Sequence, residues 1–491
     1  MCLGEILAGV RLKKPISPEL AAAAVEGLEY DSRRAGAGFL FFAFPGSRTD
    51  GRQFASDALA RGAVAVVSET ESPDARWVAV EHGRQALALA ARNFYGKPDE
   101  RLRLIGITGT NGKTTTSHLV DSVLRAAGYT TALIGTIEYH LAGRVLPAVN
   151  TTPESLDLVR LFAELEKAGG SHATMEASSH ALALGRVFGL HFHTAVFTNL
   201  TRDHLDFHGT MEAYFAAKQM LFEGAGAPPP PFAVLNRDDE YARRVRLHPG
   251  TKVCWFGLGQ EADLRARHIN SGFQGLRFDV QRGKLRFAVE SPLIGRINVY
   301  NILAACGVGL SCGIPVETIA RGIAGLRAVP GRFERVDEGQ PFMVVVDYAH
   351  TDDALRNVIA VARSLNPRRV ITLFGCGGDR DRTKRPLMGK AAAEASDFVV
   401  VTSDNPRSED PLAIINDALV GVRRVDVPHI VVPDRTAAIE RAIKEAREGD
   451  IVILAGKGHE TYQVLKDKTI PFDDRTVARE VLRGYGYHRP Q

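Results

Sequence analysis

Short apolar runs and amphipathic segments alternate along most of the chain. Near the N-terminus, the apolar runs FLFFAF (39–44) and VAVVS (64–68) flank a helix-like segment at 55–63. Further along, the strand-like RLIGIT (103–108) and the helix-like SLDLVRLFAELEKAG (155–169) continue the same rhythm. Alternating strand and helix signals are typical of a parallel sheet flanked by helices. The pattern therefore predicts an α/β protein.

Breaks in this pattern separate three regions. The segment YGKPDE (95–100) predicts a linker, because Gly and Pro interrupt regular structure, and the alternation restarts after VPGRFERV (329–336). The predicted domains are 1–97, 98–331 and 332–491, and three domains agree with the length of the chain at roughly 100–200 residues per domain. The strands expected in the third region are MVVVDYA (343–349), RVITLFG (369–375), DFVVVTSD (397–404), HIVVP (429–433) and DIVILAG (450–456). Polar residues stand at their ends, where ligands bind to open parallel sheets.

Composition narrows the classes of function. Of 491 residues, 45% are apolar and 24% charged, as in soluble globular proteins. The net charge of +4 indicates no nucleic-acid partner. Uninterrupted apolar runs such as AAAAV and FMVVV are far below the roughly 18 residues that span a bilayer, so we expect no membrane insertion. The N-terminal segment MCLGEILAGVRLKK has an acidic residue early and its basic residues after the apolar run, which is the wrong order for a signal peptide. The five cysteines lack CxxC spacing and are expected to be free thiols in the cytoplasm.

The clearest local motif is ITGTNGKTTT at 107–116, between a predicted strand and a predicted helix. Its glycines, Gly109 and Gly112, would let backbone N–H groups face phosphates, and the helix N-terminus adds a positive dipole end. Lys113 can reach the β- and γ-phosphates and the Thr114 hydroxyl can bind Mg²⁺. Position 107 is Ile where the full P-loop pattern has Gly, so the loop is a shortened variant; the alternative is a Gly-rich turn with a solvated lysine. The other expected ATP contacts in the loop are Thr110, Asn111 and Thr115.

Four later segments carry further candidate chemistry, each with an ordinary structural alternative. NTTPESLDL (150–158) suits a polar ligand or caps a helix, and MEASSHAL (175–182) places Glu176 at a strand end. TNLTRDHLDFHGT (198–210) gathers Asp and His groups that could bind a metal or form a surface cluster. Lys218 lies on the otherwise apolar helix at 214–222, where an isolated lysine more often extends to solvent.

Taken in order, these segments resemble the Mur ligase family, the ATP-dependent amide ligases of peptidoglycan precursor synthesis. The shared motifs cover nearly the whole chain and are GTNGKTT, MEASSH, TNLTRDHLDFHG, YFAAK, NVYN, GRFE, DYAH and GKGHE. The resemblance implies a small N-terminal α/β UDP-binding domain, a central P-loop ATPase domain with a parallel sheet, and a Rossmann-like C-terminal α/β domain. It also implies ATP as a co-substrate and two Mg²⁺ ions. We expect a monomer.

The resemblance assigns roles around the phosphate loop. The lysine that matches Lys218 is carbamylated by CO₂ in this family, and the carbamate helps to hold the second Mg²⁺. Thr114 and Glu176 would hold Mg²⁺, and His204 would join the second metal site. Together with Lys113, the residues Glu176, His204 and Lys218 form the expected catalytic set. Positions near the nucleotide and the interdomain hinge are matched by Asn301, Arg332 and Asp347.

Two further binding sites are implied for the rest of one substrate. The segment 31–54 resembles the UDP-binding domain of the family members that form the UDP-linked tripeptide. The expected contacts with uridine and diphosphate are Ser32, Ser47, Arg48 and Thr49. Those with the muramoyl dipeptide are Asn150, Thr151, Thr152, Ser178 and Arg186.

The third region would select the added amino acid. The tetrad DNPR, made of Asp404, Asn405, Pro406 and Arg407, resembles the form in members that add meso-2,6-diaminopimelate. Diaminopimelate carries a second carboxylate, which Arg407 can pair with bidentately. The expected partners of its other carboxylate and amine are Arg380, Gly456 and Glu460. A plain Asx–Pro turn is the structural alternative.

The chain departs from the family pattern at two positions. Residue 184 is Leu where Gln is common, which would remove one hydrogen bond to the muramoyl peptide. Residue 352 is Asp where DYAHTPDAL is usual, so the loop after Asp347 is expected to be less rigid. Neither position belongs to the expected metal or phosphate groups.

The implied activity is ATP-dependent addition of meso-2,6-diaminopimelate to the γ-carboxylate of D-glutamate in UDP-N-acetylmuramoyl-L-alanyl-D-glutamate, through an acyl phosphate. One alternative is the same ligation with L-lysine, or another ligase of the Mur or folylpolyglutamate type. From a different class, the alternative is a non-catalytic P-loop nucleotide switch. The switch would leave Glu176, His204 and Lys218 without a role.

Overall fold

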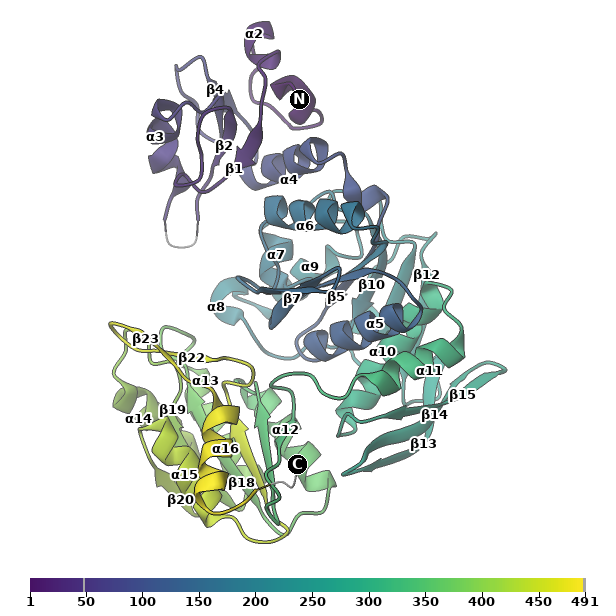
Figure 1. The fold of residues 1–491 in the computed structure, drawn as a ribbon, viewed down its shortest axis with the longest axis vertical. Coiled ribbons are helices and arrows are strands. Elements are labelled where there is room, and N and C mark those ends of the chain that lie inside the picture. Colours follow the sequence, from purple (N-terminus) through teal and green to yellow (C-terminus); the bar gives the residue numbers. More distant parts are fainter. Residues whose placement is uncertain (47–48, 489–491) are drawn as a thin grey trace.

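The structure is a computed structural model that describes residues 1–46 and 49–488. It is a three-domain α/β fold, as expected, with the domains arranged along the long axis of the molecule (Figure 1). The N-terminal region lies at one end, the central sheet in the middle and the C-terminal region at the other end. The boundaries at 97/98 and 331/332 stay predictions.

The N-terminal region is a parallel sheet in the order β1-β2-β3-β4. Its strands are β1 (Gly27–Glu29), β2 (Phe39–Ala43), β3 (Ala65–Ser68) and β4 (Trp77–Ala79), and its helices are α1 (Leu3–Ile6), α2 (Pro18–Ala21), α3 (Ala55–Ala60) and α4 (Gly83–Phe94), with a 3₁₀ turn at Gly51–Phe54. Side chains alternate across a strand, so Leu40 and Phe42 join the core on one face of the sheet, while Phe41 packs on the other. Helices therefore cover both faces.

The segment predicted as a linker is held firmly in place. A short 3₁₀ turn (Pro98–Glu100) buries Asp99, whose carboxylate accepts hydrogen bonds from Arg92 Nε at 2.9 Å and from the His191 backbone N–H at 3.2 Å. The segment therefore joins the first two regions without acting as a free spacer.

The central region is built on one large sheet. Within the described residues it has 11 strands in the order β15-β14-β13-β12-β11-β10-β5-β9-β6-β7-β8. The strands are β5 (Arg103–Thr108), β6 (Thr131–Ile134), β7 (Glu138–Leu141), β8 (Arg144–Pro147), β9 (His172–Glu176), β10 (Phe192–Phe197), β11 (Phe232–Asn236), β12 (Lys252–Gly257), β13 (Leu264–Gly272), β14 (Gly275–Arg282) and β15 (Leu285–Ser291). The middle of the sheet is parallel, as expected, and antiparallel strands extend it at both edges.

Helices pack on this sheet and position the site at its carboxyl edge. They are α5 (Lys113–Ala126), α6 (Ser155–Lys167), α7 (Ser179–Ala183), α8 (Leu205–His208), α9 (Met211–Gln219), α10 (Ile297–Ser311) and α11 (Val316–Gly325), with a 3₁₀ turn at Ala242–Arg244. β5 pairs in parallel with β9 on one side and β10 on the other. The three strands therefore end side by side, at Thr108, Glu176 and Phe197.

The C-terminal region is a second α/β unit with a sheet in the order β16-β17-β21-β18-β19-β20. Its strands are β16 (Glu334–Val336), β17 (Met343–Asp347), β18 (Val370–Cys376), β19 (Phe398–Ser403), β20 (His429–Val431) and β21 (Ile451–Ala455), with a separate hairpin of β22 (Tyr462–Val464) and β23 (Thr469–Pro471). Its helices are α12 (Asp352–Ser364), α13 (Lys384–Ala395), α14 (Pro411–Val422), α15 (Arg435–Glu445) and α16 (Asp474–Gly484). Apart from the antiparallel β16, the main sheet is parallel.

Candidate active site

The phosphate loop lies between the end of β5 and the start of α5, as the sequence predicts. Gly109 and Gly112 have φ angles of 143° and 83°, in a region that favours glycine. A Cβ on Gly109 would lie 1.9 Å from Thr198 Oγ1, and one on Gly112 would lie 2.4 Å from Asn301 Oδ1. Both positions therefore need glycine for backbone conformation and for space.

Two lysines converge on one carbonyl of this loop. Lys113 Nζ donates to Gly109 O at 3.0 Å and to Thr110 O at 2.8 Å, and Lys218 Nζ donates to Gly109 O at 2.8 Å. Lys218 is 1% exposed, so it does not extend to solvent as an isolated helix lysine would. Burial lowers the pKa of both ammonium groups, and the charge of Lys113 lowers the pKa of Lys218 further.

Glu176 faces the first turn of α5. Its Oε2 accepts a hydrogen bond from the Thr114 hydroxyl at 3.1 Å, and its Oε1 accepts the Thr136 backbone N–H at 2.9 Å. Arg332 reaches across from the C-terminal region and donates to Thr114 Oγ1 at 3.1 Å. Asp347 Oδ2 accepts the Phe333 N–H at 2.7 Å, next to Arg332, and burial raises the pKa of Asp347.

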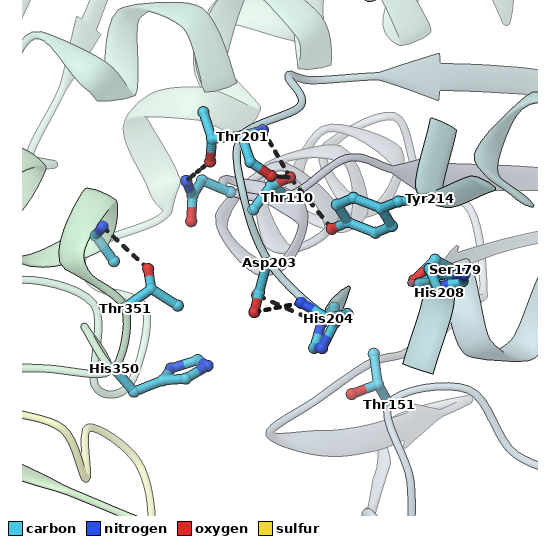
Figure 2. A network of polar contacts seen from close by, with 12 residues as sticks. Thr110, Thr151, Ser179, Thr201, Asp203, His204, His208, Tyr214, His350 and Thr351 are labelled. Atoms are coloured by element: carbon cyan, nitrogen blue, oxygen red, sulfur yellow. Dashed lines mark hydrogen bonds and ion pairs between the residues drawn. The ribbon is translucent and has the colours of Figure 1, made fainter. Parts of the chain in front are cut away.

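His204 lies beside Asp203 and near the Tyr214 ring (Figure 2). Its backbone N–H donates to Asp203 Oδ1 at 2.8 Å, and its Nε2 lies 3.4 Å from Asp203 Oδ2. Burial lowers the pKa of His204 to about 3, so the imidazole is neutral near pH 7 and free to act as a ligand. Asp203 also pairs with Lys384 Nζ at 2.5 Å, which links the central and C-terminal regions.

A cavity of about 280 Å³ lies between these two regions. The predicted residues that line it are Thr110, Asn111, Gly112, Lys113, Thr114, Thr115, Thr151, Glu176, Ser178, His204, Lys218, Asn301, Arg332 and Asp347. In the described part of the chain, no group of three or more His, Cys, Asp or Glu side chains is arranged to hold a metal. A metal in this cavity would therefore need additional ligands, such as hydroxyl groups or a modified lysine.

The residues expected to contact the muramoyl dipeptide flank the cavity. The Thr152 hydroxyl donates to Glu176 O at 2.7 Å and lies 3.2 Å from Ser178 Oγ, which caps α7. Arg186 donates to Thr152 O at 2.9 Å. Thr151 Oγ1 lies 3.1 Å from Thr136 Oγ1, and Asn150 is exposed.

The predicted nucleotide contacts of the N-terminal region lie away from this cavity. The carbonyl of Ser32 accepts a hydrogen bond from Arg61 at 2.8 Å, and Thr49 is exposed. Ser47 and Arg48 lie outside the described residues.

The predicted amino-acid-binding residues meet at the carboxyl edge of the C-terminal sheet. Asn405 Nδ2 donates to Glu460 Oε2 at 2.9 Å, joining the loops after β19 and β21. Gly456 lies beside Asp404, because a Cβ there would be 3.9 Å from the Asp404 carboxylate. The buried Pro406 follows, and Arg407 NH1 donates to Gly378 O at 2.7 Å. The Arg380 side chain is exposed at the rim.

Sequence reasoning missed Lys457, which holds this group together. Its side chain is 0% exposed; its Nζ donates to Asn405 Oδ1 at 3.0 Å and lies 3.3 Å from carboxylate oxygens of Asp404 and Glu460. The signal was present, since Lys457 belongs to the GKGHE motif.

Contacts between the central and C-terminal regions were also missed. Asp353 Oδ2 accepts hydrogen bonds from Asn111 Nδ2 at 2.7 Å and from the Thr201 hydroxyl at 3.0 Å. Arg202 NH2 donates to Thr383 Oγ1 at 3.1 Å. The sequence analysis singled out the neighbouring position 352 but not Asp353. Asp352 lies in the first turn of α12, directly after the Thr351 cap, where a carboxylate is favourable.

The phosphate loop lies at the junction of two α/β domains, and the chain belongs to the Mur ligase family, a family of ligases. The Mur ligase family catalytic domain matches residues 24–95, the Mur ligase middle domain matches 107–309, and the Mur ligase glutamate ligase domain matches 331–458.

Individual relatives cover the whole chain. The UDP-N-acetylmuramoyl-L-alanyl-D-glutamate--2,6-diaminopimelate ligase of Solibacter usitatus is 77% identical over 494 residues, covering 100% of both chains. The ligase of the same name from Geobacillus thermodenitrificans is 48% identical and covers 94% of this chain and 95% of its own. A solved structure of a ligase with that name is 34% identical, with a TM-score of 0.71 and 99% of each chain covered.

A more distant structure supports the fold alone. It is a MurF ligase from Thermotoga maritima in complex with ADP, 18% identical, with a TM-score of 0.63 and coverage of 94% of this chain and 96% of its own.

Proposed function

We propose that the protein is an ATP-dependent ligase that joins meso-2,6-diaminopimelate to the γ-carboxylate of D-glutamate in UDP-N-acetylmuramoyl-L-alanyl-D-glutamate. The observation that carries the proposal is the full-length, 77% identity to the Solibacter ligase of that name. The cavity supports it, because the phosphate loop, Glu176 and Lys218 all line the same space.

The reaction needs an activated carboxylate, because a free carboxylate is a poor electrophile. A γ-carboxylate oxygen attacks the γ-phosphorus of ATP, ADP leaves, and an acyl phosphate forms. The amine of diaminopimelate then attacks the acyl carbon, loses a proton and expels phosphate, leaving the amide. The reactants are anionic, so Lys113 and the N-terminus of α5 lower the barrier by neutralising charge on the transferring group.

The donor set of the cavity fits magnesium. Mg²⁺ prefers oxygen ligands, and the Thr114 hydroxyl and the Glu176 carboxylate lie 3.1 Å apart at the first turn of α5. When bound, Mg²⁺ would supply positive charge beside the phosphates. The second ion of the proposal would be held by His204 and a carbamate on Lys218.

Carbamylation of Lys218 gives this buried side chain a function. As an ammonium, it would share the Gly109 carbonyl with the like-charged Lys113 and would offer a metal no acceptor oxygen. A carbamate forms when the neutral amine attacks CO₂ and releases a proton, and it carries two oxygens with a negative charge. Lys113 then gains an oppositely charged neighbour in place of a cation.

The C-terminal region would bind the amino acid. Arg407 and Arg380 are proposed to pair with the carboxylates of diaminopimelate, and Asp404, Asn405 and Glu460 with its ammonium group. Lys457 supports this arrangement, because its buried charge offsets two carboxylates that would otherwise repel each other.

The N-terminal region is proposed to hold the UDP end of the other substrate through Ser32 and Thr49. The peptide end of that substrate is proposed to be bound by Thr151, Thr152, Ser178 and Arg186. We propose a monomer as the active form. In the described residues, no helix has the length and apolar character to cross a membrane. We place the reaction in the cytoplasm, in keeping with the five free cysteines.

Phosphate release tests this function. We expect release only when ATP, the UDP-muramoyl dipeptide and meso-diaminopimelate are all present, with one phosphate per amide. Phosphate release that is independent of the amino acid would point instead to a nucleotide switch.

A further inference from the structure

A trio of charged side chains, Arg84, Glu154 and Arg186, connects the N-terminal and central regions. Glu154, just before α6, accepts hydrogen bonds on its Oε1 from Arg84 of α4 and from Arg186, the latter at 3.0 Å. The side chains of Arg84, Glu154 and Arg186 are only 12%, 11% and 17% exposed. Two guanidinium groups thus share one carboxylate in a largely desolvated place, where such bonds are strong and directional.

The Arg84 side of this charged trio contacts Phe44 and Pro45, which precede the residues proposed to bind the diphosphate. The Arg84 guanidinium lies over the Phe44 ring, 4.6 Å from its centroid, and NH2 donates to Pro45 O at 3.3 Å. Phe44 and Pro45 begin the loop that leads to Thr49. The opposite end is Arg186, which also donates to Thr152 O beside the cavity.

A second contact, between Tyr30 and Asp157, also joins the N-terminal and central regions. The Tyr30 hydroxyl donates to Asp157 Oδ2 at 2.5 Å, so the N-terminal region meets the start of α6 at two points. Tyr30 stacks on Phe44 at a centroid distance of 6.3 Å, and Phe44 therefore contacts both Tyr30 and Arg84. Phe44 is therefore linked to the central region through both Tyr30 and Arg84.

We propose that Glu154 is a positioning residue that, through Arg84, fixes Arg186 relative to Phe44 and Pro45 just after β2, so that the two ends of one UDP-linked peptide are bound in register. The inference rests on the proposed function, which supplies a substrate with a nucleotide at one end and a peptide carboxylate at the other. Neither Glu154 nor Arg84 needs to touch the substrate.

Charge explains why a carboxylate belongs at this point. Without Glu154, the guanidinium groups of Arg84 and Arg186 would repel each other and separate. With it, the trio keeps a net charge of +1, which still favours an anionic substrate, while both arginines stay oriented. One carboxylate oxygen, Glu154 Oε2, is buried with no hydrogen-bond partner among the described residues, so the anchoring depends on Oε1.

The test is steady-state kinetics of Glu154→Gln, Arg84→Met and the double variant, with the UDP-muramoyl dipeptide and ATP varied separately. We expect each single variant to raise KM for the UDP-muramoyl dipeptide about tenfold, with KM for ATP changed less than about twofold. KM of the double variant for the UDP-muramoyl dipeptide should be within about twofold of that of the worse single variant, because both substitutions break the same link.

A matched control is Glu164→Gln on the same helix. Glu164 pairs with Arg144 at 2.9 Å, but both side chains are largely exposed, so both KM values should stay unchanged. If Glu154→Gln does not fold, Arg84→Met carries the test from the N-terminal side.

The outcomes separate this inference from the function on which it rests. If the unaltered protein forms no product, the proposed function fails and the inference fails with it. If the unaltered protein is active, the inference is overturned by an unchanged KM for the UDP-muramoyl dipeptide or by multiplicative effects in the double variant. Equal rises in both KM values, accompanied by a lower melting temperature, would also overturn it, because they would indicate a purely structural role.

Discussion

At the scale of single residues, the site depends on charged side chains held where water cannot reach them. Lys218 is buried against Gly109 O, and Lys457 is buried between Asp404 and Glu460. A buried charge is costly unless it is paired. Lys457 has its carboxylate partners in the structure, whereas the proposed carbamate would reverse the charge of Lys218.

Removing Lys218 tests the carbamate. Lys218→Ala should lose most of the activity, about 100-fold or more, because the proposed ligand oxygens and their charge are lost. Lys218→Glu should not restore it fully, because the shorter side chain misplaces the oxygens. Added short-chain carboxylates should partly rescue Lys218→Ala, as measured by amide formation. An intact-protein mass without the added carbamate, together with full turnover by Lys218→Ala, would contradict this role.

Arg407 tests amino-acid selection. Losing a charge-assisted bidentate pair leaves the distal carboxylate of diaminopimelate unpaired, at a cost of about 2–4 kcal/mol. Arg407→Ala should therefore lower kcat/KM for diaminopimelate about 30-fold or more, with KM for ATP unchanged. The idea fails if the variant keeps its preference for diaminopimelate over L-lysine.

At the scale of elements, the site forms where β5, β9 and β10 end together. The turn after β5 supplies the phosphate loop, and the strand end of β9 supplies Glu176. The first residues of α5, Lys113, Thr114 and Thr115, line the cavity, where the helix N-terminus favours negative charge.

The phosphate loop can be tested through Lys113. Lys113→Ala should reduce amide formation about 100-fold or more, because positioning and charge neutralisation dominate phosphoryl transfer. The circular dichroism spectrum should stay unchanged, because among the described residues the lysine side chain donates to two loop carbonyls, Gly109 O and Thr110 O. Normal turnover by a folded variant would exclude this loop as the ATP site.

Local sequence predicted these elements well and long-range pairing poorly. The order of strand, glycine turn and helix at 103–126 could be predicted because it depends on neighbours in sequence. The antiparallel strands at the sheet edges, such as β13 to β15, could not, since their pairing is not encoded in local periodicity. The burial of Lys218 was equally hidden, because a helical pattern shows which face is apolar but not what covers it.

At the scale of the whole molecule, the central and C-terminal regions contact each other through polar groups beside the cavity. Asp353 bonds to Asn111 of the phosphate loop, and Lys384 pairs with Asp203, next to His204. These contacts join segments about 180 to 240 residues apart in sequence, so no local motif could reveal them. They hold the C-terminal region against the reacting groups, and closure of this kind excludes water.

Removing the contact between Lys384 and Asp203 should increase hydrolysis of the acyl phosphate relative to amide formation. Lys384→Met removes the partner of Asp203 and should lower the rate of amide formation about tenfold. Water should then reach the acyl phosphate, so that phosphate release exceeds amide formation. Measuring both products in one reaction gives the ratio. Lys390→Met on the same helix is the control, because the ion pair of Lys390 is with the exposed Glu394 of its own helix. A ratio of one in Lys384→Met would show that the contact does not exclude water.

The central claim is the identity of the amide that the protein makes. The most direct measurement is the mass and fragmentation of the nucleotide product formed from ATP, UDP-N-acetylmuramoyl-L-alanyl-D-glutamate and an equimolar mixture of meso-diaminopimelate and L-lysine. We predict a UDP-linked tripeptide in which diaminopimelate is joined to the γ-carboxylate of D-glutamate, with little or no lysine product. Equal amounts of the two products, or no product, would contradict the account.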